Sequence, residues 1–345
     1  MENKKILPND YQPCLDFFQT EKAIKLVKDT FEHQLAEKLS LLRVTAPRFL
    51  AVGQGLQDDL AGTQIPVSFN TKFTDKRIEV VHSLAKWKRY TLGRYHFKQS
   101  QGIYTDMDAI RKDEEVDEIH SIYVDQWDWE RVISPTERTI DFLKQIVTKI
   151  YQTMVDTEEI VKREYPNLKK RLPKKIYFIH TEELEEQYPE LNSAQREKEI
   201  TKKYGAVFLI GIGHPLKSGK PHDLRAADYD DWSTETEKSR KGLNGDILVW
   251  DEVRQEVLEL SSMGIRVDAP ALLKQLEMMD LIQRKDLEFH RQVIEDKIPL
   301  SIGGGIGQSR LCMLLLEKAH IGEVQSSVWP EEVVTEFERR KVPLL

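Results

Sequence analysis

The sequence predicts an α+β fold with a mainly antiparallel sheet flanked by helices. Three observations support this prediction: a long amphipathic segment near the N-terminus, short apolar runs of mixed spacing along the chain, and helical patterns between those runs. The chain has 345 residues and no Pro/Gly/Ser-rich linker divides it. We therefore expect a single domain spanning residues 1–345.

The first half of the chain begins with an amphipathic helix over residues 19–42, in which apolar side chains recur every three or four positions. Residues 43–52 then have an extended pattern. Pro47 lies within them and lacks a backbone donor, so we expect this strand at an edge or an interface. Residues 102–109 and 121–129 predict two further strands joined by a charged turn.

Helical patterns also cover residues 83–90 and 135–164, and we expect a helical insertion over about 135–205. Short apolar runs predict buried strands at 176–180 and 206–212. Later in the chain the pattern predicts a hairpin formed by 246–250 and 257–261, and then a glycine-rich turn at 303–305 that opens an apolar helix.

Composition narrows the class of protein. The chain carries 51 Lys+Arg and 58 Asp+Glu, a net charge of −7, which argues against a nucleic-acid coat. It has no apolar run of the roughly 18–20 residues that cross a bilayer, and its first ten residues lack the apolar stretch of a secretory signal. Two cysteines exclude a disulfide framework and a Cys-rich zinc module. We expect a cytoplasmic protein with neither nucleic acid nor membrane as partner.

Familiar phosphate-binding and hydrolase motifs fail. The stretch 213–221 has the wrong glycine spacing for a P-loop, and Pro221 stands where Ser or Thr would bind magnesium. Gly211 and Gly213 lack the third glycine of a dinucleotide turn. The sequence also has no Gly-x-Ser-x-Gly elbow.

A more informative motif joins Arg111 to the stretch 121–130. Strand alternation puts Gln126 and Asp128 on one face, and Arg111 ends the opposing strand. A guanidinium forks onto phosphate, while a carboxylate and an amide hold an ammonium or amide group. The alternative interpretation is an exposed sheet face with incidental charges.

Two later motifs carry similar chemistry. Asp246 and Glu259 fall on the predicted hairpin, where two carboxylates can share Mg²⁺ with ligand phosphates. The glycines at 303–305 allow close approach of a ligand, and Arg310 follows on the helix, where it can meet a nucleotide. A surface hairpin with spare acids remains the alternative for the first of these motifs.

Together, in this order, these motifs resemble those of the class II aminoacyl-tRNA synthetase catalytic core. The closer resemblance is to the ammonia-dependent asparagine synthetase A family, whose signature stretches are similar to residues 82–89, 123–130, 227–233, 242–250 and 259–266. The resemblance runs from about residue 20 to the C-terminus. It implies the class II core fold and one catalytic domain. It also implies a homodimer, with the helix at 19–42 in the interface.

The same resemblance implies a ligase that makes L-asparagine from L-aspartate, ammonia and ATP. Its products are AMP and pyrophosphate, formed through a β-aspartyl adenylate with Mg²⁺. Nothing in the chain suits a tRNA-reading module, and Glu2 stands where a glutaminase would place its cysteine, so free ammonia is the expected nitrogen donor.

Candidate site residues follow from the motifs and the resemblance together. The catalytic candidates are Arg111, Asp58, Gln126 and Asp128, and the metal ligands are Asp246 and Glu259. ATP is expected to contact Arg111, Arg225, Arg310 and Gly305. Aspartate is expected to contact Lys88, Ser83, Asp230, Ser262 and Arg266.

Four of these candidates have plainer interpretations. Asp58 can belong to a polar turn, Lys88 to a solvated helix face, Asp230 to a helix cap, and Arg225 to a mobile loop.

Two other functions stay open from the sequence. One is a tRNA synthetase relative acting on another amine acceptor, against which the missing tRNA module counts. The other is a regulator that only binds amino acid or AMP. Arg111, Asp246, Glu259 and Arg310 count against a regulator, since a pure binder needs no magnesium carboxylates.

Overall fold

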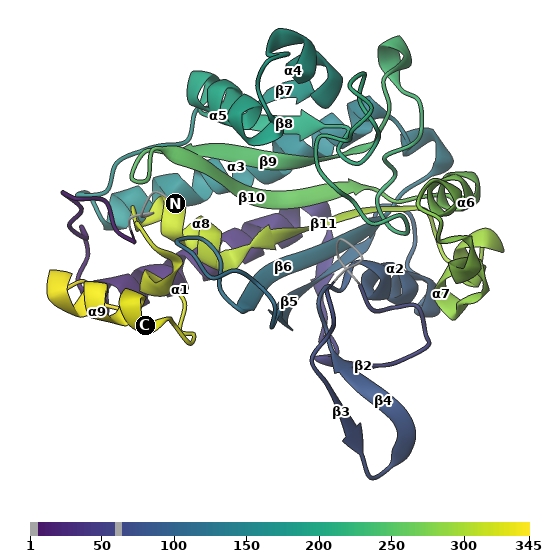
Figure 1. Ribbon diagram of the computed structural model, residues 1–345, viewed down its shortest axis with the longest axis horizontal. Coiled ribbons are helices and arrows are strands. Elements are labelled where there is room, and N and C mark those ends of the chain that lie inside the picture. The colour runs from purple at the N-terminus through teal and green to yellow at the C-terminus, as the bar shows by residue number, and fades with distance from the viewer. Residues whose placement is uncertain (1–5, 59–63) are drawn as a thin grey trace.

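The computed structural model describes residues 6–58 and 64–345. An eight-stranded sheet forms its centre, in the order β1-β5-β6-β11-β10-β9-β8-β7 (Figure 1). The strands are β1 (Leu41–Arg43), β5 (Gly102–Ile110), β6 (Tyr123–Val132), β11 (Ser301–Gly307), β10 (Glu256–Ile265), β9 (Asn244–Asp251), β8 (Ala206–Ile210) and β7 (Tyr177–His180).

Only the two outermost pairs of this sheet, β1 with β5 and β7 with β8, are parallel. All pairs between them are antiparallel. The predicted α+β fold with a mainly antiparallel sheet is therefore confirmed, as is the hairpin of β9 and β10.

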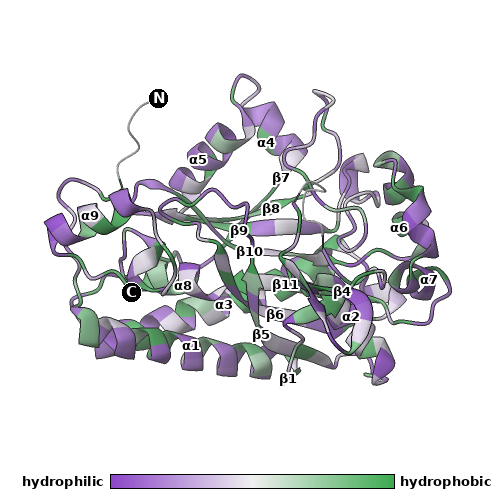
Figure 2. Ribbon diagram, turned by 60° about the horizontal axis from the view of Figure 1, so that its bottom comes forward, coloured by the Kyte–Doolittle hydropathy of each residue, from purple (hydrophilic) through white to green (hydrophobic). Residues whose placement is uncertain are grey.

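Two long helices, α1 (Phe17–Leu39) and α3 (Ile140–Glu164), cover one face of the sheet (Figure 1). The Asp16 carboxylate caps α1 and accepts a hydrogen bond from the amide of Gln19. Phe31 of α1 packs on Trp127 of β6 with ring centroids 4.6 Å apart. Figure 2 shows hydrophobic and hydrophilic residues alternating along α1, as expected of a helix with one buried stripe.

The remaining helices lie at the ends and edge of the sheet. They are α2 (Ala85–Arg94), α4 (Thr181–Gln187), α5 (Ser193–Tyr204), α6 (Ala269–Met278), α7 (Glu288–Ile294), α8 (Gln308–Leu315) and α9 (Glu331–Arg340), with short 3₁₀ turns at Pro135–Glu137, Glu237–Ser239, Ile282–Asp286 and Ile321–Glu323. A second sheet, β2 (Phe49–Ala51), β4 (Thr74–Val80) and β3 (Ser68–Thr71), projects from the body (Figure 1).

Most predicted boundaries differ from the structure by a few residues, and three differences have a clear cause. The first helix ends at Leu39, not at 42, because Ser40 adopts a left-handed conformation with φ 57° and β1 follows. The range 135–205 is not wholly helical, since β7 lies between α3 and α4 and extends the sheet. Residues 43–52 do not form one strand. They are divided between β1 and β2, and Pro47 lies outside both.

The glycines at 303–305 do not form a turn. They lie inside β11, the strand between β6 and β10. Neighbouring side chains lie so close to them that a Cβ on Gly304 would come within 2.5 Å of the Met263 Cβ. Here glycine serves close strand packing, and the helix that follows begins only at Gln308.

Among the described residues, no helix is long and apolar enough to span a bilayer.

Candidate active site

A cavity of about 330 Å³ lies on the face of the sheet opposite α1. Its position follows from strand alternation in β6: Trp127 packs on α1, while Gln126 and Asp128 face the cavity. Every candidate site residue predicted from the sequence lines this cavity except Asp246, which contacts one that does. These residues come from segments between Asp58 and Arg310, so the fold assembles the site from nearly the whole chain.

One end of the cavity holds a buried lysine on α2. Lys88 Nζ donates to Asp128 Oδ1 at 2.5 Å and to the Gly304 carbonyl at 2.9 Å. Burial lowers the pKa of Lys88, although the Asp128 carboxylate opposes this shift. The second carboxylate oxygen of Asp128 has no hydrogen-bond partner among the described residues. This oxygen is therefore available to a ligand.

Beside this pair lies Arg266, the residue that follows β10. Carboxylates contact its guanidinium group from two sides. Its Nε lies 3.0 Å from Glu130 Oε1 and its Nη2 lies 2.7 Å from Glu130 Oε2, while Nη1 donates to Asp230. Burial alone would raise the pKa of Glu130, but Arg266 and Lys88 bring it below its usual value. Glu130 and Arg266 are therefore both charged, and Arg266 has a fixed orientation.

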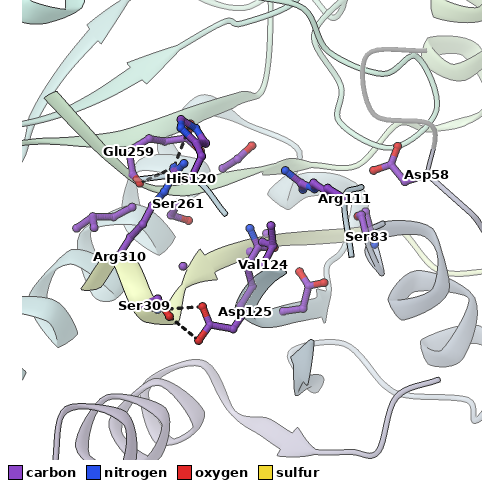
Figure 3. Close-up of a pocket in the computed structure, with 18 of the residues that line it drawn as sticks. Asp58, Ser83, Arg111, His120, Val124, Asp125, Glu259, Ser261, Ser309 and Arg310 are labelled. Carbon is purple, nitrogen blue, oxygen red and sulfur yellow. Dashed lines mark hydrogen bonds and ion pairs between the residues drawn. The ribbon is translucent and has the colours of Figure 1, made fainter. Parts of the chain in front are cut away.

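Arg111 lies toward the end of the cavity that also holds Ser83 and Asp58 (Figure 3). Its nearest described carboxylate is that of Glu114, at 3.9 Å. The Arg111 Nε is buried and has no hydrogen-bond partner among residues 6–58 and 64–345. A half-buried guanidinium with an unsatisfied, buried donor favours an anionic ligand at this point.

The opposite end is formed by Arg310, Glu259 and His120 (Figure 3). Arg310 Nη1 donates to the Glu259 carbonyl at 3.1 Å and lies 3.9 Å from its carboxylate. The Glu259 side chain is 44% exposed and so remains open to solvent and ligands. His120 Nδ1 lies 2.8 Å from Asp117, an ordinary structural contact.

Asp246 lies just outside the cavity wall and forms an ion pair with Arg225. Burial raises the pKa of Asp246 to about 8; Arg225 opposes this shift, while the neighbouring Glu259 carboxylate adds to it. A carboxylate in this position is stabilised by an additional cation. Among the described residues, no three His, Cys, Asp or Glu side chains gather as a complete metal site.

Two site residues were not singled out from the sequence. Glu130 is fully buried and orients Arg266, but 136 positions separate the pair and no local pattern marks it. Asp125 accepts hydrogen bonds from the Ser309 amide and hydroxyl at 3.1 and 2.8 Å, and Lys28 of α1 lies 3.1 Å away (Figure 3). In the sequence, Asp125 lies in a stretch where polar residues and Trp alternate, and that pattern indicated only a strand.

The fold and cavity define a catalytic core of the class II aminoacyl-tRNA synthetase type. The structure is similar to asparaginyl-tRNA synthetase from Pyrococcus horikoshii complexed with asparaginyl-adenylate, with a TM-score of 0.64, 18% identity, and coverage of 90% of this chain and 70% of that one. It is also similar to aspartyl tRNA synthetase from Entamoeba histolytica, with a TM-score of 0.58, 14% identity, and coverage of 89% and 58%. At these identities the likeness shows the fold.

The chain belongs to the aspartate–ammonia ligase family, whose model matches residues 18–341. It is 55% identical to the aspartate–ammonia ligase of Parabacteroides distasonis over 329 residues, 95% of each chain. It is 54% identical to that of Bacteroides fragilis over 341 residues, 99% of each chain. Over 343 residues it is 52% identical to a Clostridium perfringens aspartate–ammonia ligase, again covering 99% of each chain.

Proposed function

We propose that this chain joins L-aspartate and ammonia into L-asparagine, converting ATP to AMP and pyrophosphate through a β-aspartyl adenylate. One observation carries the proposal. A single cavity brings together buried cation–carboxylate pairs, the unsatisfied Nε of Arg111 and, at the end away from Arg111, an open arginine and glutamate (Figure 3). These three sets of groups match an amino acid, an α-phosphate and the rest of a nucleotide.

The end containing Lys88 and Arg266 suits aspartate, which has two carboxylates and one ammonium group. Lys88 and Arg266 supply fixed positive charge for a carboxylate. The free oxygen of Asp128 and the carboxylate of Asp230 supply negative charge for the ammonium group. Ser83, Ser262 and Gln126 line the same cavity and complete the polar contacts.

The part of the cavity around Arg111 suits the α-phosphate. The aspartate β-carboxylate attacks this phosphorus in line, and the bond to pyrophosphate breaks. Negative charge grows on the α-phosphate oxygens, and the unsatisfied Nε of Arg111 is placed to neutralise it. Arg310 binds the nucleotide, with the backbone of Gly305 beside it, and Arg225 binds a further phosphate, since its Nε also has no described partner.

Magnesium fits the part of the site near Asp246 and Glu259. Mg²⁺ binds through one or two carboxylates and fills its remaining positions with water and substrate phosphates. The high pKa of Asp246 and its repulsion by Glu259 are the marks of a carboxylate pair that gains from a cation. Asp246 and Glu259 would hold Mg²⁺, which supplies charge neutralisation for the leaving pyrophosphate.

The second half-reaction needs ammonia at the acyl carbon. Ammonia attacks the adenylate, the acyl–phosphate bond breaks, and AMP leaves. Asp58 lines the cavity at the end where Arg111 and Ser83 lie (Figure 3). A carboxylate there can attract ammonium and accept its proton before the attack.

The proposal includes a homodimer in a reducing cytoplasm. Two apolar side chains are exposed to solvent: Leu42 of β1 is 60% exposed, and Phe49 of β2 is 51% exposed. Both described cysteines, Cys14 and Cys312, are free thiols. Sedimentation equilibrium of the purified chain tests the dimer.

The decisive experiment supplies ATP, Mg²⁺ and aspartate with ammonium or glutamine, without tRNA, and measures AMP and asparagine. We expect equal amounts of both products, with ammonium preferred over glutamine. ATP–pyrophosphate exchange without asparagine would contradict the proposal and indicate another acceptor. Ligand binding without turnover would indicate a regulator.

A further inference from the structure

A second cavity, of about 240 Å³, lies next to the active site. Its titratable lining, among the described residues, is Asp58, Glu79, Lys86, Asp228, Arg284 and His290. None of these except Asp58 was assigned to the reaction above. The cavity therefore needs its own explanation.

The two cavities share one lining residue, and two segments of the chain have residues in both cavities. Asp58 lines both. Lys86 and Lys88 are two positions apart on α2, hence about 200° apart around its axis, and they face the second and the first cavity respectively. The bent segment at 227–230 likewise presents Asp228 to the second cavity and Asp230 to the first.

Two polar atoms facing the second cavity have no partner within the described part of the chain. These are Asp228 Oδ1 and His290 Nδ1, and both side chains are fully buried. The other Asp228 oxygen lies 3.0 Å from Lys86 Nζ, 3.0 Å from His290 Nε2 and 3.5 Å from Arg284 Nη1. A carboxylate oxygen accepts hydrogen bonds, so a ligand that satisfies Asp228 Oδ1 is a donor. In the tautomer whose Nε2–H donates to Asp228, the Nδ1 of His290 is an acceptor as well.

The charged groups of the lining and the limited space beside His290 further restrict which ligand can bind. Among the described residues that line the cavity, the three acidic side chains of Asp58, Glu79 and Asp228 outnumber the two basic side chains of Lys86 and Arg284 by one. Gly55 packs so closely on His290 that a Cβ there would lie 3.2 Å from Nδ1. A small monovalent cation with N–H donors meets all three requirements.

We infer that the second cavity collects ammonium and delivers it past Asp58 to the reaction centre. This inference rests on the proposed function and extends it to the path of the nucleophile. The Asp58 side chain lies at the end of the active-site cavity opposite Arg310 and Glu259, as Figure 3 shows. Ammonium can therefore arrive while the nucleotide fills the other end.

The test uses the full chain and measures each half-reaction separately. H290F removes both ring nitrogens but keeps an aromatic ring, and Asp228 retains Lys86 and Arg284. L287F puts a larger side chain into the cavity wall and narrows the cavity without changing a charged group. For each variant we expect the KM for ammonium to rise about tenfold, as for loss of one hydrogen bond to a charged ligand. Aspartate-dependent ATP–pyrophosphate exchange without ammonium should change less than about twofold.

His222 provides a matched control. It is also buried, its Nε2 lies 2.8 Å from a carboxylate (Glu197), and its Nδ1 has no described partner, but it lines neither cavity. H222F should leave the KM for ammonium unchanged. Thermal melting monitors folding, and if H290F does not fold, L287F decides the question.

Two results would overturn the inference: an unchanged KM for ammonium in the folded variants, or pyrophosphate exchange that falls together with asparagine formation. Neither touches the proposed function, which fails only if the wild-type chain makes no asparagine from ammonium.

Discussion

The Arg266 guanidinium lies along the Glu130 carboxylate, with Nε 3.0 Å from one oxygen and Nη2 2.7 Å from the other. The Ser301 hydroxyl donates to the same carboxylate at 2.7 Å. Both partners are almost completely buried. The pair thus fixes a cation in the wall of the cavity before any ligand binds. It also joins β6 to the end of β10.

E130Q tests this pair. The substitution leaves the Arg266 charge buried with only Asp230 to oppose it, so we expect unfolding to become easier by about 3 kcal/mol. The KM for aspartate should rise because the guanidinium loses its orientation. Urea titration and steady-state kinetics measure the two effects. The control E288Q breaks an exposed pair with Arg291 and should leave the stability nearly unchanged. Equal stability of E130Q and E288Q would contradict the prediction.

R111A tests the α-phosphate contact. We expect aspartate-dependent ATP–pyrophosphate exchange to fall about 10²–10³-fold, the usual effect of losing one transition-state donor. Circular dichroism should be unchanged, since the ion pair of Arg111 with a described residue is a 3.9 Å contact with Glu114. K112A, which removes the neighbouring exposed lysine, is the control. Exchange at the normal rate in R111A would refute the assignment.

D246N tests the metal site. Loss of one carboxylate should raise the Mg²⁺ concentration that gives half-maximal pyrophosphate exchange by about tenfold or more. E256Q on the same hairpin is the control, because Glu256 pairs only with Lys198 at the surface. Titration of exchange against Mg²⁺ gives both values. An unchanged Mg²⁺ requirement would exclude Asp246 as a ligand.

His320 predicts a pH dependence of stability. Burial lowers its pKa to about 4, and its Nδ1 accepts a hydrogen bond from the Gly322 amide at 3.0 Å, which protonation would break. Between pH 6.5 and 4 the unfolded chain binds a proton that the folded chain does not. This group's contribution is therefore complete above pH 6.5, and about 3 kcal/mol is lost as the pH falls to 4.

Urea unfolding of the wild-type chain and H320Q at pH 7.5 and 5 measures that contribution. The wild-type chain should lose more stability than H320Q between the two values. Equal losses would show that His320 is protonated in the folded state.

Regular periodicity made much of the fold predictable. The α1 stripe, the alternation of β6 and the hairpin of β9 and β10 are local patterns, and each was correct within a few residues. The glycines of β11 were misjudged because seven residues with four glycines have neither a strand's side chains nor its alternation. Their conformation is set by β6 and β10 on either side.

The candidate site was predictable where residues lie near one another in a motif, as Gln126 and Asp128 do on one strand face. Pairs between distant segments were not. Arg225 with Asp246 and Lys86 with Asp228 depend on how a loop or a helix packs, and no spacing within the sequence encodes that packing.

The first turn of α2 has a consequence for how the chain can change. Lys86 and Lys88 meet Asp228 and Asp128 on different sides of one helix. Replacing either lysine alters one contact, whereas inserting or deleting a residue between them turns one lysine by about 100° around the helix relative to the other. The spacing of the two lysines therefore matters independently of the chemistry of each: with an error of one position, only one of them can face its carboxylate.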